Sequence, residues 1–199
     1  MQDNLRIFNV LDFLTPDTED IVGEEMLKHS FSDFSCAKNI DVERFLKKSS
    51  IEFTKKHQSV TYLVFSEDEK TLLGYFSLAI KPITVRADRL SKTALRKIAR
   101  VSEFDERTKT YTLSAYLIAQ LGKNDSPKCK QLLTRGRLLD AAISTVLMAQ
   151  QMVGGMVVFL EAEENEKLLQ YYEKENGFRA FDTRESGKHK SLIKLLKVL

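Results

Sequence analysis

The chain has 199 residues, of which 43% are hydrophobic and 30% charged, and carries a net charge of +3. This is the composition of a folded soluble protein, so we expect residues 1–199 to form one domain. The mildly basic balance permits an anionic partner but does not require one. Cys36 and Cys129 lack metal-site or disulfide-framework spacing, so we predict no metal and a reducing, cytoplasmic location. The segment MQDNLRIFNVLDF does not have the pattern of a signal peptide.

The first half of the chain predicts a strand, two helices and a hairpin, in that order. Residues 5–11 (LRIFNVL) indicate a first strand, and residues 16–31 a helix with an acidic first turn. Residues 41–57 repeat apolar side chains at helical spacing and predict a second, amphipathic helix. Residues 60–85 contain two runs of β-branched and aromatic residues joined by a charged turn, which is typical of a β-hairpin.

The second half begins with a short basic helix, predicted over residues 91–104, followed by the longest expected strand at 110–121. Residues 122–136 are predicted to be a loop, 137–151 a helix and 156–161 a buried strand. A helix near 165–175 and two closing strands at 178–183 and 191–199 complete the order β-α-α-β-β-(α)-β-α-β-α-β-β. We therefore expect an α/β fold without internal repeats.

Residues 141–160 contain no charged residue, so they must be weighed as a membrane span. Ser144, Thr145, Gln150 and Gln151 interrupt the run, and Gly154-Gly155 would break a helix in its middle. We expect instead a largely buried helix, a glycine turn and a buried strand, and we predict no membrane association.

The segment between the 110–121 strand and the 137–151 helix is basic and contains a glycine. It carries five cations: Lys123, Lys128, Lys130, Arg135 and Arg137. Backbone N–H groups at the beginning of a helix, together with its positive dipole end, favour a phosphate or pyrophosphate. A solvated basic loop would have the same composition, so this pattern alone leaves both interpretations open.

Combined with the order of elements, this segment resembles the GCN5-related N-acetyltransferase family, whose acetyl-CoA loop reads Q/R-x-x-G-x-G/A. Gln131 and Gly136 match the ends of the motif, and Thr134 occupies the place of its middle glycine. Because threonine disfavours positive φ, we expect the loop to follow a somewhat different path around the pyrophosphate.

A second motif of the same family matches residues 165–178. The family often has Asn, then Tyr seven residues later, then Gly-Phe. Asn165, Tyr172 and Gly177-Phe178 follow that pattern with one extra residue before the glycine. Tyr171 stands where the family usually has leucine, so we expect it to face the core and Tyr172 to face the substrate cleft.

The resemblance implies a mixed, largely antiparallel sheet flanked by helices, and direct acetyl transfer from acetyl-CoA to a primary amine. Tyr172 would then be the acid that protonates the departing thiolate; the alternative is that both tyrosines only pack. The implied acetyl-CoA contacts are the amides of Leu121, Gly122 and Lys123 along the pantetheine arm, the pyrophosphate loop and Asn165. That loop comprises Gln131, Leu132, Leu133, Thr134, Arg135, Gly136 and Arg137.

No general base has a recognisable pattern. The 110–121 strand offers only Ser114 and Tyr116, while Glu103 and Glu161 could act through water. The three histidines, His29, His57 and His189, have neither metal-ligand nor triad spacing. A missing base favours an α-amino acceptor, whose pKa of about 8 leaves it partly neutral, over a lysine side chain.

Residues 31–50 resemble the entry motif of acetyltransferase toxins that act on aminoacyl-tRNA. Phe34, Cys36, Phe45 and Leu46 match it, whereas Ala37 replaces a glycine. The basic helix could face a phosphate backbone, although a charged helix is more often a solvated face. The acceptor stays open among aminoacyl-tRNA, a small molecule and a protein, and the partners considered are tRNA, an antitoxin and a second copy of the chain. Two other functions stay open: a non-catalytic acyl-CoA-binding sensor or interaction module, and an RNA-binding protein without CoA.

Overall fold

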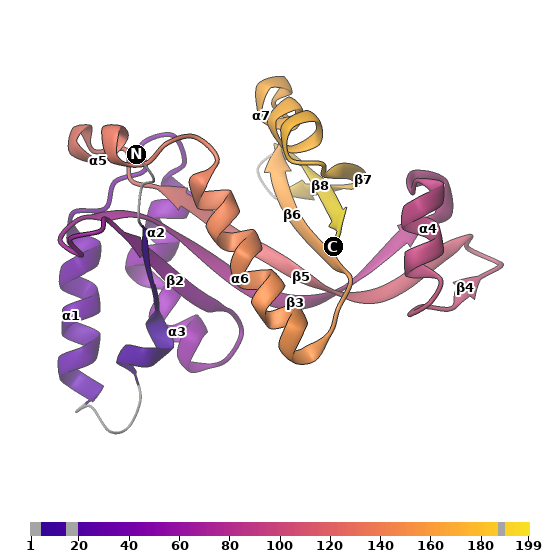
Figure 1. Cartoon of the computed structure of the whole chain (residues 1–199). Coiled ribbons are helices and arrows are strands. Elements are labelled where there is room, and N and C mark those ends of the chain that lie inside the picture. The colour runs from indigo at the N-terminus through magenta and orange to yellow at the C-terminus, as the bar shows by residue number, and fades with distance from the viewer. Residues whose placement is uncertain (1–4, 15–19, 187–189) are drawn as a thin grey trace. The chain divides into compact units, whose positions relative to one another are not determined.

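In the computed structural model of the protein, residues 5–14, 20–186 and 190–199 are described (Figure 1). Contacts divide the chain into two compact units. Unit 1 comprises residues 1–79 and 119–145, and unit 2 comprises residues 80–118 and 146–199. Strands β3 (Leu72–Arg86) and β5 (Thr110–Lys123) and helix α6 (Arg137–Val153) each contribute residues to both units. That residues 1–199 form one domain stays a prediction.

Unit 1 begins with strand β1 (Arg6–Asn9) and a 3₁₀ helix (Val10–Phe13), followed by three helices and strand β2. These are α1 (Asp20–Ser32), α2 (Ile40–Lys48), α3 (Ser50–Lys55) and β2 (Val60–Phe65). The unit also contains the start of β3, the end of β5, helix α5 (Pro127–Leu132) and the start of α6. β1 pairs with β2, and β2 with β3, both antiparallel.

The two faces of the unit 1 sheet are covered by different helices. Tyr75 of β3 belongs to a buried cluster with residues of α1, α2 and α3, including Leu27, Leu46 and Ile51. Because side chains alternate along a strand, the neighbouring Gly74 faces the other way. A Cβ atom at Gly74 would lie 3.2 Å from the side chain of Leu138, so α6 covers that second face.

Unit 2 contains the rest of β3, a 3₁₀ helix (Ala87–Arg89), helix α4 (Lys92–Ile98) and strand β4 (Phe104–Asp105). After β5 and the end of α6 come β6 (Val157–Glu163), α7 (Glu166–Gln170), a π-helical turn (Tyr171–Glu175), β7 (Arg179–Ser186) and β8 (Lys190–Val198). β5 and β6 pair in parallel, whereas β4–β5, β6–β8 and β8–β7 pair antiparallel. Val85, Ile98, Tyr111, Phe159 and Leu196 belong to the buried core of this unit.

The predicted fold class, an α/β fold with a largely antiparallel sheet, is confirmed, as is the predicted order of the main elements. Several details of the prediction were wrong. The helix expected over 41–57 is divided at Ser49 into α2 and α3, since the φ of −126° at Ser49 is not helical. The longest strand is β3, with 15 residues, and not β5, with 14.

The predicted loop 122–136 contains a helix that the sequence did not suggest. Residues 127–132 form α5, with Pro127 at its beginning and buried Cys129 on its inner side. Proline suits the first turn of a helix, because the N–H that it lacks would have no intrahelical partner there. The helix has only six residues, too few for a periodic apolar pattern to be recognised.

The helix expected to be largely buried is buried only in part. In α6, Leu138, Leu139 and Ala142 are buried, but its last turns expose Leu147, Met148, Met152 and Val153. Gly154 and Gly155 follow with φ of 78° and 105°, which confirms the expected glycine turn. Among the described residues, no helix is long and apolar enough to cross a membrane.

Candidate functional site

The end of β5, where the pantetheine arm is expected, packs closely against α2. A Cβ atom at Gly122 would lie 2.6 Å from both the Tyr75 ring and a methyl group of Val42. The Tyr75 hydroxyl donates a hydrogen bond of 2.6 Å to the Val42 carbonyl. Only glycine leaves room for this contact, so packing by itself accounts for the residue type at position 122.

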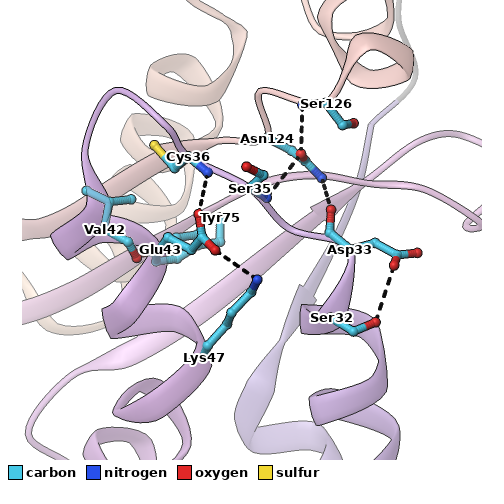
Figure 2. Close-up of polar contacts among 10 residues, drawn as sticks. All are labelled: Ser32, Asp33, Ser35, Cys36, Val42, Glu43, Lys47, Tyr75, Asn124 and Ser126. Carbon is cyan, nitrogen blue, oxygen red and sulfur yellow. Dashed lines mark hydrogen bonds and ion pairs between the residues drawn. The ribbon is translucent and has the colours of Figure 1, made fainter.

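Asn124, directly after β5, joins three segments of unit 1, and Figure 2 shows its contacts with Asp33, Ser35 and Ser126. Its Oδ1 accepts from the backbone N–H groups of Ser35, at 3.3 Å, and Ser126, at 3.1 Å. Its Nδ2 donates to the carbonyls of Asp33, at 3.2 Å, and Leu72, at 2.9 Å. With 2% of its surface exposed, the side chain uses its whole hydrogen-bonding capacity on backbone groups. Sequence reasoning missed this residue, because a lone asparagine after a strand usually indicates only a turn.

The expected pyrophosphate loop is shorter than predicted. Gln131 and Leu132 belong to the last turn of α5, so the connection to α6 consists of residues 133–136. Leu133 is buried, and its carbonyl accepts a hydrogen bond from Lys123 Nζ. Thr134 and Arg135 are exposed, and Arg137 begins α6.

The backbone of this connection uses one glycine where the family motif has two. Gly136 has a φ of 92°, a conformation that favours glycine, while Thr134 is not among the described residues with positive φ. The threonine therefore fits its place without the strain that a left-handed conformation would impose. How the segment would pass around a pyrophosphate stays a prediction.

The residues that resemble the toxin entry motif lie in the connection between α1 and α2 and in α2 itself. Phe34 and Leu46 are buried. The Phe34 ring packs edge-on against the Tyr75 ring, with 5.4 Å between the ring centroids. The Glu43 carboxylate accepts two hydrogen bonds of 2.9 Å each, one from the backbone N–H of Cys36 and one from Lys47 Nζ (Figure 2). Burial raises the pKa of the Cys36 thiol, so this cysteine is not an activated nucleophile.

In unit 2, the second motif forms a capped helix that ends in a π turn. The Asn165 side chain accepts from the Leu168 N–H at 3.2 Å and caps α7. The π turn Tyr171–Glu175 contains one more residue per turn than regular helix does, which accommodates the extra residue of the motif. Gly177 then ends the segment with a φ of 70°, and the Phe178 N–H donates to the Tyr172 carbonyl at 3.0 Å.

The burial of the two tyrosines differs from the expectation. Tyr172 is 8% exposed, and its ring packs edge-on against the Phe178 ring with 5.8 Å between the centroids. Tyr171 is only half-buried. Tyr171, which was expected to face the core, is therefore the more exposed of the two rings. Burial, and secondarily Tyr171, raises the pKa of Tyr172 to about 12. Its phenol is protonated throughout the neutral range.

The side chains considered as bases are engaged elsewhere or exposed. The Tyr116 hydroxyl donates to the Gly154 carbonyl and anchors the glycine turn. Glu161 forms an ion pair with Arg184 at an N···O distance of 3.5 Å. Ser114 and Glu103 are exposed, and His189 lies outside the described residues. Nor does the described part of the chain contain a group of three or more His, Cys, Asp or Glu residues that could hold a metal ion.

The predicted site residues thus fall into two groups. Unit 1 brings together Leu121, Gly122 and Lys123 with the segment from Gln131 to Arg137, through the bond between Lys123 and Leu133. Unit 2 contains Asn165 and Tyr172 on one short helical segment. That both groups serve one acetyl-CoA molecule is a prediction from the family resemblance.

Comparisons with known proteins identify the fold. No protein-family profile and no curated protein sequence matches the chain. Among solved structures, AtaT complexed with acetyl-methionyl-tRNAfMet is 20% identical, with a TM-score of 0.61 over 96% of this chain and 94% of that one. A KacT variant is also 20% identical, with a TM-score of 0.60 over 99% and 95%. AtaTR bound with AcCoA is similar at 20% identity, with a TM-score of 0.58 over 100% and 95%.

The chain has the fold of the GCN5-related N-acetyltransferases. AtaT and KacT are toxins of this fold, and the likeness extends over nearly the full length of each chain. This confirms the expected fold, which rested on two short motifs and the order of elements. At 20% identity the likeness does not extend to individual site residues.

The raised pKa of Tyr172 predicts a loss of stability in alkali. Its folded pKa of about 12 exceeds the value of about 10 for an unfolded tyrosine. The stabilisation is therefore complete below pH 10 and is lost as the pH rises toward 12. Between pH 9 and 11, we expect the free energy of unfolding to fall by about 1 kcal/mol more in the wild type than in Tyr172→Phe.

Urea unfolding at several pH values measures this difference. Tyr171→Phe serves as the control, since it removes the same group from the half-buried neighbour and should keep the pH dependence of the wild type. An identical alkaline slope for wild type and Tyr172→Phe would contradict a buried phenol at position 172.

Proposed function

We propose that this protein is an acetyl-CoA-dependent N-acetyltransferase that transfers the acetyl group directly to a primary amine. The observation that carries the proposal is the fold, shared with AtaT and KacT, together with the acetyl-CoA bound in a solved AtaTR structure. The two motif matches support it. The backbone of residues 121–123 would line the pantetheine arm, and residues 131–137 would hold the pyrophosphate.

In the proposed reaction, the amine nitrogen attacks the thioester carbonyl carbon and forms a tetrahedral intermediate. The carbon–sulfur bond then breaks, the electron pair leaves with sulfur as a thiolate, and the nitrogen gives up its proton to solvent. The Tyr172 hydroxyl would lie within hydrogen-bonding distance of the sulfur. A full proton transfer from a phenol of pKa about 12 to a thiolate whose acid has pKa about 8.5 is uphill by about 5 kcal/mol. Tyr172 therefore serves as a hydrogen-bond donor that stabilises the developing negative charge.

We further propose that the acceptor is the α-amino group of an aminoacyl-tRNA. Three observations support this class. AtaT, of the same fold, has been captured with acetyl-methionyl-tRNAfMet. The side chains considered as bases are engaged or exposed, which suits an amine of low pKa. Helix α4 and the turn after it expose Lys92, Arg96 and Arg100 at helical spacing, and no ion pair involves these three residues within the described part of the chain.

The likeness also supports a protein partner. Solved structures contain AtaT together with the antitoxin AtaR. We propose that a small antitoxin, encoded directly upstream, binds this chain. An association of two copies stays a prediction from the family resemblance.

The first prediction from this proposal concerns binding of the co-substrate. Isothermal titration of the folded protein with acetyl-CoA should give saturable binding. The backbone of residues 131–137 would donate to the phosphates of acetyl-CoA, and the end of β5 would bind the amides of its pantetheine arm. A folded protein that shows no binding would overturn the proposal. Binding without release of free CoA over a broad set of amines and aminoacyl-tRNAs would indicate the non-catalytic acyl-CoA-binding module instead.

The second prediction separates the two tyrosines. Removing the Tyr172 hydroxyl should lower kcat by roughly 10²–10³-fold, with little change in acetyl-CoA affinity, since the bond to sulfur strengthens only as charge develops. Tyr171→Phe should leave kcat nearly unchanged. The measurement is steady-state release of CoA alongside titration with acetyl-CoA. Small, equal effects of both substitutions would remove Tyr172 from the reaction, and the opposite ranking would assign its role to Tyr171.

The third prediction tests the nucleic-acid acceptor. Replacing Lys92, Arg96 and Arg100 by glutamate should lower kcat/KM for an aminoacyl-tRNA at least tenfold. It should also make the slope of log K for tRNA binding against log salt concentration shallower, by the equivalent of about 2–3 phosphate contacts. Acetyl-CoA binding by the same variant is the control and should not change. If the variant acetylates aminoacyl-tRNA as well as the wild type does, α4 is not part of the acceptor site.

A further inference from the structure

Helix α5 is bound at both ends by two consecutive residues of one strand end. At its beginning, Asn124 Oδ1 accepts from the Ser126 N–H at 3.1 Å. At its end, Lys123 Nζ donates to the Leu133 carbonyl. The inner side of the helix is also fixed, because Cys129 and Leu133 are buried and the Cys129 thiol lies 3.6 Å from the Leu72 carbonyl. α5 is therefore held against the sheet of unit 1 along its whole length.

The backbone on both sides of Lys123 is held in place by hydrogen bonds and packing. The Asn124 N–H donates to the Leu73 carbonyl at 2.8 Å, and Asn124 Nδ2 donates to the Leu72 carbonyl at 2.9 Å. The neighbouring Gly122 is packed between Tyr75 and Val42. These contacts hold Lys123 at the strand end, so the ammonium group can fix the position of what it binds.

What Lys123 binds is the first carbonyl of the segment 133–136. The ammonium group satisfies a carbonyl at the C-terminal end of α5, where a cation is favourable. Three residues later, Gly136 turns the chain into α6 with a φ of 92°. The segment is thus fixed at Leu133 by Lys123 and at its other end by the 17-residue helix α6. The exposed residues Thr134 and Arg135 lie between these two fixed ends.

We propose that Lys123 is a positioning residue for the co-substrate: its side chain holds the Leu133 carbonyl, and so keeps the amides of residues 133–136 in the arrangement that receives the pyrophosphate. The inference rests on the proposed function for the identity of the ligand. It changes the expected roles of Lys123, which sequence reasoning placed at the pantetheine arm through its backbone amide and among the five cations near the phosphate. The side chain acts through Leu133 and does not touch acetyl-CoA.

The test compares Lys123→Met, which keeps the aliphatic stem but removes the donor, with Lys123→Arg, which keeps a cationic donor. Hydrogen exchange of the amides of residues 133–137, without ligand, should be faster in Lys123→Met and close to wild type in Lys123→Arg. Exchange in β2 and the melting temperature should change little. Affinity for acetyl-CoA should fall about tenfold in Lys123→Met and recover in part in Lys123→Arg.

A direct bond from Lys123 to a phosphate must be told apart from positioning, because an ammonium group has three N–H donors. The dependence of acetyl-CoA affinity on salt concentration separates the two. Positioning predicts the same dependence in Lys123→Met as in Lys48→Met, a control that removes an exposed lysine from α2 of the same unit. A weaker dependence in Lys123→Met alone would indicate a direct phosphate contact and overturn the proposal.

Two further results would also overturn it: unchanged exchange at residues 133–137 in Lys123→Met, or faster exchange throughout unit 1. Failure of the wild type to bind acetyl-CoA is a different outcome. It would reject the proposed function, while the exchange measurement would still report whether Lys123 fixes the segment.

Discussion

Asn124 places a complete amide group where water hardly reaches it, and each of its polar atoms has backbone partners. These partners come from the segment after α1, from β3 and from the beginning of α5, so one side chain sets the distances among three segments that are remote in sequence. Losing it would leave the buried Leu72 carbonyl without this donor, at a cost of about 1–3 kcal/mol, and would release three part-buried backbone groups. The positions of α5, of Lys123 and of the connection to α6 all depend on this contact.

Two departures from the family motifs are absorbed by local backbone geometry. Thr134 stands where the motif has glycine, yet the chain needs a left-handed residue only at Gly136. The extra residue before Gly177 becomes part of a π turn, which adds one residue without ending the helix. In both places the backbone of this chain adopts the departure without a strained non-glycine residue.

The chemistry proposed for this protein relies more on orientation and polarity than on proton transfer. A buried phenol with a raised pKa is a stable hydrogen-bond donor and a weak acid. Glu161 lies beside Arg184, and Tyr116 is bound to the glycine turn, so these two groups have structural partners of their own. Such a site suits an amine that is already partly neutral and a thiolate that leaves readily.

The sequence by itself determined the class and order of the elements, because apolar periodicity and glycine positions are local properties that survive in any context. It also located both motifs, and it recognised the Gly154-Gly155 turn. It did not determine which tyrosine is buried, since the burial of Tyr172 depends on its contact with Phe178 beyond the π turn. Nor could it find α5, the break at Ser49 or the role of Asn124. The role of Asn124 and the placement of α5 rest on contacts between residues up to 91 positions apart in the chain, and no local pattern encodes these contacts.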